Sequence, residues 1–135
     1  MNDLIEFLRA RIDEDERIAL ATQTCNCGRC EMPLAWTIDD DGIDPLGVGL
    51  RHTVAPGYLN PEQGAHIVHQ DPDRTLREVE AKRRILEFTL EQVRWIDEYT
   101  HTPYAEGAEI DLLESMAWPY SDHPEWREEW RPTSA

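Results

Sequence analysis

Three cysteines fall within the segment TQTCNCGRCEMPLAW at residues 22–36, as Cys25, Cys27 and Cys30. Zinc in proteins takes four ligands in a tetrahedron, most often thiolates and imidazoles. Cys27 and Cys30 have the two-residue spacing of a zinc knuckle. Gly28 between them lets the backbone turn so that both sulfurs can face one point. With Cys25 as a third ligand, the segment predicts a zinc site.

The fourth ligand has to come from one of five histidines. His52 ends the second strand of a predicted hairpin that begins just after the cluster, while His66 and His69 lie one helical turn apart and can face one direction. We take Cys25, Cys27, Cys30, His52 and His66 as the candidate ligands. Four protein ligands leave no open position for water, so the expected zinc is structural and ties down the loop.

Two other interpretations of the thiols stay open. The thiols could be unligated in a loop, or Cys27 and Cys30 could form a redox dithiol. Thioredoxin-like chemistry places such a pair after a strand and at the start of a helix. Here the pair follows a predicted helix and precedes a predicted strand, which disfavours the redox role.

Apolar residues at three- and four-residue steps predict the helices. The first covers residues 2–20, a short one covers 61–70, and another covers 109–118. The longest begins at Asp71-Pro72, capped by Asp71 or Asp73, and reaches Tyr99. One apolar stripe runs along it, formed by Leu76, Val79, Leu86, Leu90 and Val93. The stripe is widened by Ile85, Phe88, Trp95, Ile96 and Tyr99.

Alternating side chains at 34–38 and 46–54 predict two strands that form a small β-hairpin, with a turn at Asp41-Gly42. The expected fold class is α+β and mostly helical. A long central helix, two shorter helices and the small β-hairpin make one domain over residues 1–135. Residues 119–135 form an aromatic C-terminal tail.

The tail contains EWREEWRP, which places Trp126 and Trp130 four residues apart with arginines beside them. On a helical turn the two indoles share one face. They could fold back and seal the core, since large aromatic side chains are rarely left exposed. They could also dock a partner, because Trp and Arg are favoured anchors of interfaces. The candidate partner-binding residues are Tyr120, His123, Trp126 and Trp130.

The chain has 28 acidic and 13 basic residues and a formal net charge of -15. Phosphates would be repelled by most of such a surface, so direct binding to nucleic acid or to an anionic membrane is not expected. The charge serves solubility, or it lets the protein occupy a basic groove as DNA mimics do. No signal peptide or apolar stretch of about 20 residues is found, which predicts a cytoplasmic protein without a membrane span.

Three stretches together resemble a known family. They are LIEFLRARIDEDERIA, HIVHQDPDRTLREVEAKRRIL and WPYSDHPEWREEWRP. This combination resembles the small, acidic, uncharacterised proteins of actinobacteria and their phages catalogued as domain of unknown function six-two-two-one. The resemblance implies such a source and a cytosolic setting, but no activity. Family members often carry Cys pairs between the long helix and the closing block. Residues 87–117 contain no Cys here, which puts a family-wide metal site in doubt.

No catalytic residues are assigned, because the sequence has no His-Glu-x-x-His motif, phosphate-binding Gly loop or Gly-x-Ser-x-Gly elbow. The expected function is that of a non-enzymatic accessory protein that binds a protein partner and holds a structural zinc. A homo-oligomer through the long helix is possible. One alternative is a small metal-dependent enzyme using His52, His66, His69 and His123. Another is an acidic DNA mimic that inhibits a DNA-binding enzyme.

Overall fold

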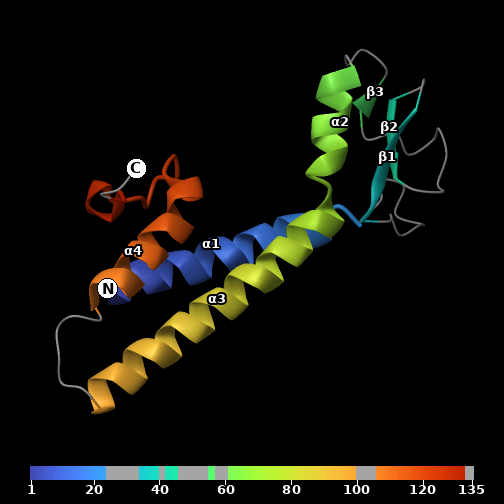
Figure 1. Ribbon diagram of the computed structural model, residues 1–135. Helices are drawn as coiled ribbons and strands as arrows, with labels where there is room; N and C mark the ends of the chain where they lie inside the picture. The colour runs from blue at the N-terminus through green and yellow to red at the C-terminus, as the bar shows by residue number, and fades with distance from the viewer. Residues whose placement is uncertain (24–33, 40–41, 46–54, 57–60, 100–105, 133–135) are drawn as a thin grey trace. The chain divides into compact units, whose positions relative to one another are not determined.

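The computed structural model describes residues 1–23, 34–39, 42–45, 55–56, 61–99 and 106–132. This part of the chain is mostly helical, with α1 Asn2–Ala21, α2 Pro61–His69, α3 Pro72–Tyr99 and α4 Glu106–Ala117 (Figure 1). Short elements complete it: strands β1 Trp36–Asp39, β2 Gly42–Pro45 and β3 Ala55–Pro56, and 3₁₀ helices η3 Trp118–Tyr120 and η4 Glu128–Trp130. Contacts divide the chain into unit 1, Met1–Glu14 with Glu80–Ala135, and unit 2, Asp15–Val79.

Unit 2 contains a small antiparallel sheet in the order β1-β2-β3. Trp36 pairs with Pro45 and Asp39 with Gly42 between the first two strands, and Ile43 pairs with Ala55 between the last two. The side chain of Ile43 is fully buried. The returning strand predicted over 46–54 lies outside the described residues, and the described partner of β1 is instead 42–45.

Asp71 connects this sheet to the start of α3. Its Oδ1 accepts the backbone N–H of Arg74 at 2.8 Å, the bond that an N-cap residue makes to the third helical residue. Its Oδ2 accepts the backbone N–H of Trp36 in β1 at 3.3 Å. Asp73, the other cap that the sequence allows, instead pairs with Arg77 one turn along the helix. Asp71 is therefore the cap, and Pro72 takes the first helical position, where its missing N–H costs nothing.

Replacing Asp71 by alanine is expected to lower the free energy of unfolding by about 1–2 kcal/mol, because the helix loses its cap and Trp36 loses its acceptor. Asp73→Ala is the matched control, since an exposed ion pair one turn apart on a helix contributes about 0.3–0.5 kcal/mol. Urea unfolding followed by circular dichroism measures both. Equal losses in the two variants would contradict the assignment of the cap.

The core of unit 1 begins with α1, whose residues at three- and four-residue steps turn to one side. Leu8 is fully buried and Ile12 is 1% exposed. The other elements of the unit add Leu86 and Thr89 from α3 and Leu113 and Ala117 from α4. Thr89 is the one buried polar residue among those described, and its hydroxyl donates to the backbone oxygen of Ile85 at 2.8 Å. An ion pair of 2.7 Å between Arg83 and Asp13 also links α3 to α1.

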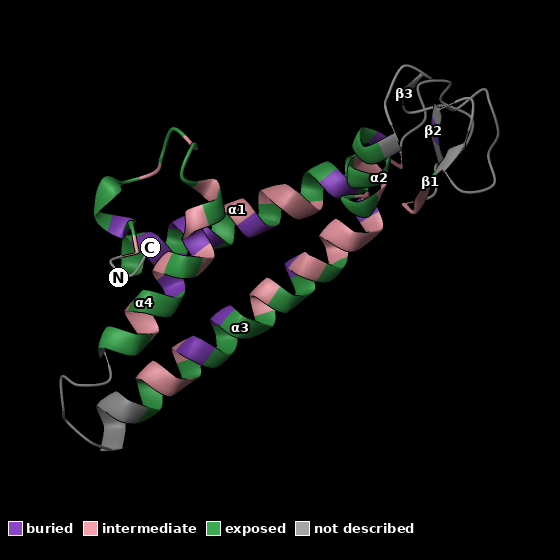
Figure 2. Ribbon diagram, turned by 45° about the horizontal axis from the view of Figure 1, so that its top comes forward, coloured by how far each residue is buried: buried purple, intermediate pink, exposed green. Residues whose placement is uncertain are grey.

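The apolar stripe predicted on α3 is only partly buried. Leu86 is buried, but Ile85, Phe88 and Trp95 are 42%, 62% and 55% exposed. Buried and exposed positions alternate along α3 within unit 1 (Figure 2). The apolar residues of the helix span a wider arc than its neighbours cover, so they divide into an inner and an outer stripe. We define the outer stripe as Ile85, Phe88 and Trp95 of α3 together with Leu112 of α4, which is 41% exposed.

Candidate functional site

Residues 118–130 pack on the first turns of α1 through an aromatic cluster centred on Phe7. The Phe7 ring lies 5.0 Å from the ring of Trp130 and 6.1 Å from that of Trp126, measured between centroids. Tyr120 and His123 contact the same ring edge-on at 6.4 and 5.8 Å. Trp130 is 7% exposed and Phe7 is 5% exposed, whereas the other members are half-buried. The tail therefore closes the core of unit 1 with Trp130.

Short turns, and not a continuous helix, bring these rings together. The backbone N–H groups of Ser121, His123, Trp126 and Trp130 each donate to the carbonyl three residues earlier, at 2.9–3.1 Å. Pro119 and Pro124 lack the N–H that a longer helix would need at these positions. Trp126 and Trp130 meet edge-to-face at 5.8 Å, while Trp126 contacts Trp118 at 6.1 Å.

A cation lies over each of four rings of the cluster. The guanidinium carbons of Arg11, Arg127 and Arg131 lie 5.5, 5.1 and 4.8 Å from the ring centroids of Phe7, Trp130 and Trp118, respectively. The ammonium of Lys82 lies 4.9 Å from the ring of Tyr120 and donates to its hydroxyl at 2.6 Å. Such pairs contribute about 0.5–1 kcal/mol each at exposed sites and more where water is excluded. Part of the sparse positive charge of the chain is therefore used to hold the tail.

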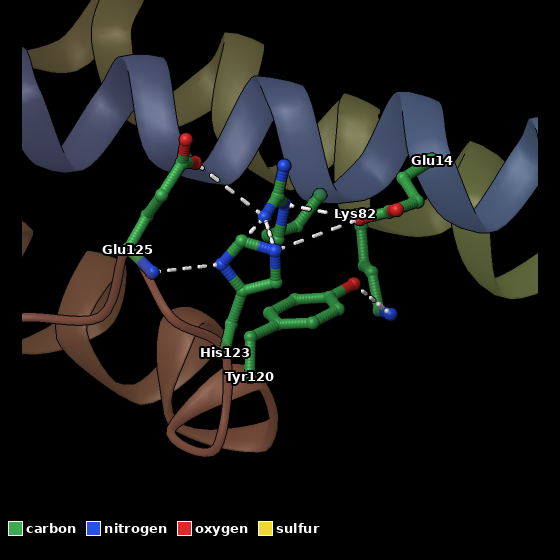
Figure 3. Close-up of polar contacts among 6 residues, drawn as sticks. Glu14, Lys82, Tyr120, His123 and Glu125 are labelled. Atoms are coloured by element: carbon green, nitrogen blue, oxygen red, sulfur yellow. Dashed lines mark hydrogen bonds and ion pairs between the residues drawn. The ribbon is translucent and has the colours of Figure 1, made fainter.

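His123 forms the polar side of this contact between α1 and the tail (Figure 3). Its Nδ1 accepts from Nη1 of Arg11 at 2.6 Å and from the backbone N–H of Glu125 at 3.1 Å. Its Nε2 lies 4.0 Å from a carboxylate oxygen of Glu14. Arg11 also lies against Nε2.

Arg11 binds both the helix that carries it and the tail. Its Nε is 3.4 Å from Oε2 of Glu14 on α1, and its Nη1 is 3.5 Å from Oε2 of Glu125 in the tail. The Arg11 side chain is 12% exposed, so its charge is balanced in a largely dehydrated position. This arrangement holds the tail in place, with the imidazole already used as an acceptor.

A hollow of about 610 Å³ opens in unit 1 where the tail meets α1. Its lining combines two rings, three carboxylates, a guanidinium and a methyl group: Asp3, Glu6, Phe7, Ala10, Glu125, Arg127 and Trp130. Arg127 pairs with Asp3 at 2.6 Å and with Glu129 at 3.7 Å. The hydrogen bond to Asp3 is the main cause that raises the pKa of Arg127 above its usual value. The hollow is thus acidic and aromatic, with one cation at its edge.

The structure brings the four predicted tail residues, Tyr120, His123, Trp126 and Trp130, into one cluster. The zinc ligands predicted at Cys25, Cys27, Cys30 and His52 lie outside the described residues. His66 is described and is exposed on α2. Within the described part of the chain, no group of three or more His, Cys, Asp or Glu side chains is placed to hold a metal ion.

Sequence reasoning missed the α1 side of the contact, above all Phe7 and Arg11. A signal was present, because an aromatic ring and a guanidinium four residues apart lie on the same side of a helix.

Among the described helices, none combines the length and the apolar character needed to cross a membrane.

Comparison with known proteins gives one result. The model of the Family of unknown function (DUF6221) matches residues 1–132. No curated protein matches significantly, and no solved structure does. The resemblance carried by the three sequence blocks is confirmed by this match over nearly the whole chain. The chain therefore belongs to the Family of unknown function (DUF6221).

Proposed function

We propose that this protein is a small acidic accessory protein of the cytoplasm that binds another protein through the outer stripe of α3 and α4. The exposure of four large apolar side chains, between 41% and 62%, carries this proposal. Contiguous exposed apolar surface marks interaction sites, whereas scattered single residues do not.

Three of the four residues, Ile85, Phe88 and Trp95, lie on one side of α3, and the fourth, Leu112 of α4, lines a hollow together with Phe88. Positions 85, 88, 92 and 95 fall on one side of a helix, because steps of three, four and three residues nearly complete each turn. A second hollow, of about 180 Å³, lies at the same surface. It is mostly apolar and is lined by residues of α3 and α4: Phe88, Thr89, Gln92, Ala108, Glu109 and Leu112. The surface offers a ridge with an adjacent recess, which suits the apolar face of a partner helix.

The charge of the chain favours a partner of different sequence over a second copy. Two copies that each carry a net charge of -15 repel one another on approach. A partner with positive charge around an apolar patch would be attracted and would bury the same surface. An inhibitor that occupies the basic groove of a DNA-binding enzyme is a narrower form of this proposal. It predicts that the partner's DNA competes for binding.

Phe88→Asp is expected to reduce partner binding at least about tenfold, because an aromatic anchor becomes a charge that cannot be buried. The unfolding temperature should change little, since the ring is 62% exposed. The purified chain is immobilised, and each protein retained from a cell lysate is then tested as a purified partner by calorimetry. Light scattering on the same preparation reports self-association.

Glu91→Ala is the matched control, because Glu91 is exposed on the same helix outside the outer stripe. Binding to the identified partner should survive this change. Equal affinity of the wild type and Phe88→Asp would contradict the proposed surface. A stable dimer that Phe88→Asp dissociates would show that the partner is a second copy.

We also propose that Cys25, Cys27 and Cys30, with a histidine such as His52 or His66, hold a structural zinc. The two-residue spacing of Cys27 and Cys30 supports this proposal, and Gly28 between them suits the turn of a knuckle. Zinc would supply folding free energy to a segment that has few apolar residues of its own.

Native mass spectrometry of protein purified without chelator is expected to show one bound zinc. Cys27→Ser with Cys30→Ser should lose it and should unfold at a lower temperature, because structural zinc contributes directly to folding. Ser121→Ala, a change at an exposed hydroxyl in unit 1, controls for the handling of variants. Metal-free wild type with an unchanged melting temperature in the double variant would contradict the zinc site.

A further inference from the structure

We infer that the partner of the outer stripe carries an arginine beside its apolar anchors, and that Glu109 of α4 binds this arginine. The inference rests on the outer stripe being the docking surface proposed above, and it names the group that this surface selects in a partner. It is carried by the position of one carboxylate in an otherwise apolar hollow.

Glu109 lies inside the surface that a partner would cover. It lines the hollow of about 180 Å³ together with Phe88 and Leu112, which are 62% and 41% exposed. Pockets for drug-sized ligands measure about 300–1,000 Å³, so this hollow suits one side chain of a partner and not a cofactor. A partner that buries the two apolar side chains therefore also takes the carboxylate of Glu109 out of water.

The chain itself offers this carboxylate no donor. Oε2 of Glu109 is already buried, and it has no hydrogen-bond partner within the part of the chain that the structure describes. The hydroxyl of Thr89, which also lines the hollow, donates its proton to the backbone oxygen of Ile85 at 2.8 Å. A carboxylate that is buried without a cation is strongly unfavourable. The compensation therefore has to come from the partner.

Arginine suits this position better than other side chains do. An apolar residue would leave Glu109 unpaired, and an acidic residue would repel it. The guanidinium can bond both carboxylate oxygens at once, and its flat face can stack on the exposed ring of Phe88. The ammonium of lysine is more strongly hydrated and loses more on burial. Glu109 thus selects against purely apolar partners as well as for basic ones.

The probes are two synthetic helices with a stripe of leucines along one face and glutamines along the other. One carries an arginine beside the leucines, and the other carries citrulline there, which keeps the shape without the charge. Each helix is titrated into the full chain while the backbone amide signals are followed by NMR. We expect the signals of Glu109 and Leu112 to shift with both probes. The arginine probe should bind about tenfold more tightly, because hydrogen bonds to charged groups are the stronger ones.

Two variants locate the origin of this preference. Glu109→Gln removes the charge and keeps the shape, so it should weaken the arginine probe and strengthen the citrulline probe, leaving a preference of about twofold or less. Asp111→Asn makes the same change of net charge from an exposed position on the same helix and should leave the preference intact. This control separates Glu109 from the general attraction that a net charge of -15 exerts on any basic peptide.

The outcomes distinguish this inference from the surface on which it rests. Equal affinities of the two probes for the wild type overturn the role of Glu109 and leave the outer stripe standing, and this comparison needs no variant to fold. The same loss of preference in Glu109→Gln and Asp111→Asn has the same meaning. Phe88→Asp should abolish binding of both probes. Probes that shift no signal of α3 or α4 overturn both the inference and the proposed surface.

Discussion

Trp130→Ala is expected to lower the free energy of unfolding by about 3–5 kcal/mol, the range found when a buried large aromatic is cut to alanine. Trp130 is 7% exposed, and its ring contacts Phe7 at 5.0 Å and Trp126 at 5.8 Å. Its removal leaves a cavity against α1 and releases Arg127 from its stacking partner. Thermal unfolding followed by circular dichroism, together with urea unfolding, measures the loss.

Trp95→Ala is the control for this prediction, because it deletes the same side chain from a position that is 55% exposed. Its effect should stay within about 0.5 kcal/mol, as is usual for surface substitutions. If both tryptophan variants unfolded at the same urea concentration as the wild type, Trp130 would not close the core of unit 1.

Arg11→Ala is expected to cost about 2–3 kcal/mol, a loss typical of hydrogen bonds to charged groups in dehydrated positions. Arg11 is 12% exposed and bonds His123 while lying between Glu14 and Glu125. Without it, the imidazole loses a donor and two carboxylates lose the cation between them. Arg11→Lys should restore only part of the loss, since an ammonium cannot reproduce the flat guanidinium over Phe7.

Arg9→Ala controls for the charge and helix propensity of this replacement, because Arg9 is exposed two residues earlier on α1. A double-mutant cycle with His123→Ala isolates the contact itself and should give a coupling energy of about 1–2 kcal/mol. Independent, additive losses at Arg11 and His123 would show that the two side chains do not interact in solution.

Local signals predicted the helices well. The apolar spacing of α1 and the Asp71-Pro72 step gave the first helix and the start of α3, since caps and helical periodicity are properties of neighbouring residues. The outer stripe could not be predicted in this way. Periodicity shows which residues of α3 are apolar, but it does not show how much of the helix its neighbours will cover.

The sheet was predicted less well for a related reason. Strand preference depends on what packs against the strand, and the run of acidic residues before Gly42 favoured a turn. The described strands pair Asp39 with Gly42, close to the predicted turn, but the strand after it is 42–45, which buries Ile43. Which of the strand residues becomes buried depends on what packs against the sheet, and the local sequence does not specify this.

The candidate site shows the same division between local and distant information. Composition marked the tail aromatics, and these do gather in one cluster. Their partners Phe7 and Arg11 were not predicted, because 112 positions separate Arg11 from His123 in the chain. No local pattern specifies a meeting over that distance, whereas the three-dimensional structure shows it directly.

The division into units also sets an order for synthesis. Unit 2 is one continuous stretch, so all of it has been synthesised before the second segment of unit 1 begins. Unit 1 is assembled from two separated segments. Asp3 therefore cannot pair with Arg127 until the ribosome has added 124 more residues. At translation rates of about 5–20 residues per second this delay is roughly 6–25 s. During that interval the apolar side of α1 lacks its aromatic cover, and exposed apolar surface of this kind favours aggregation.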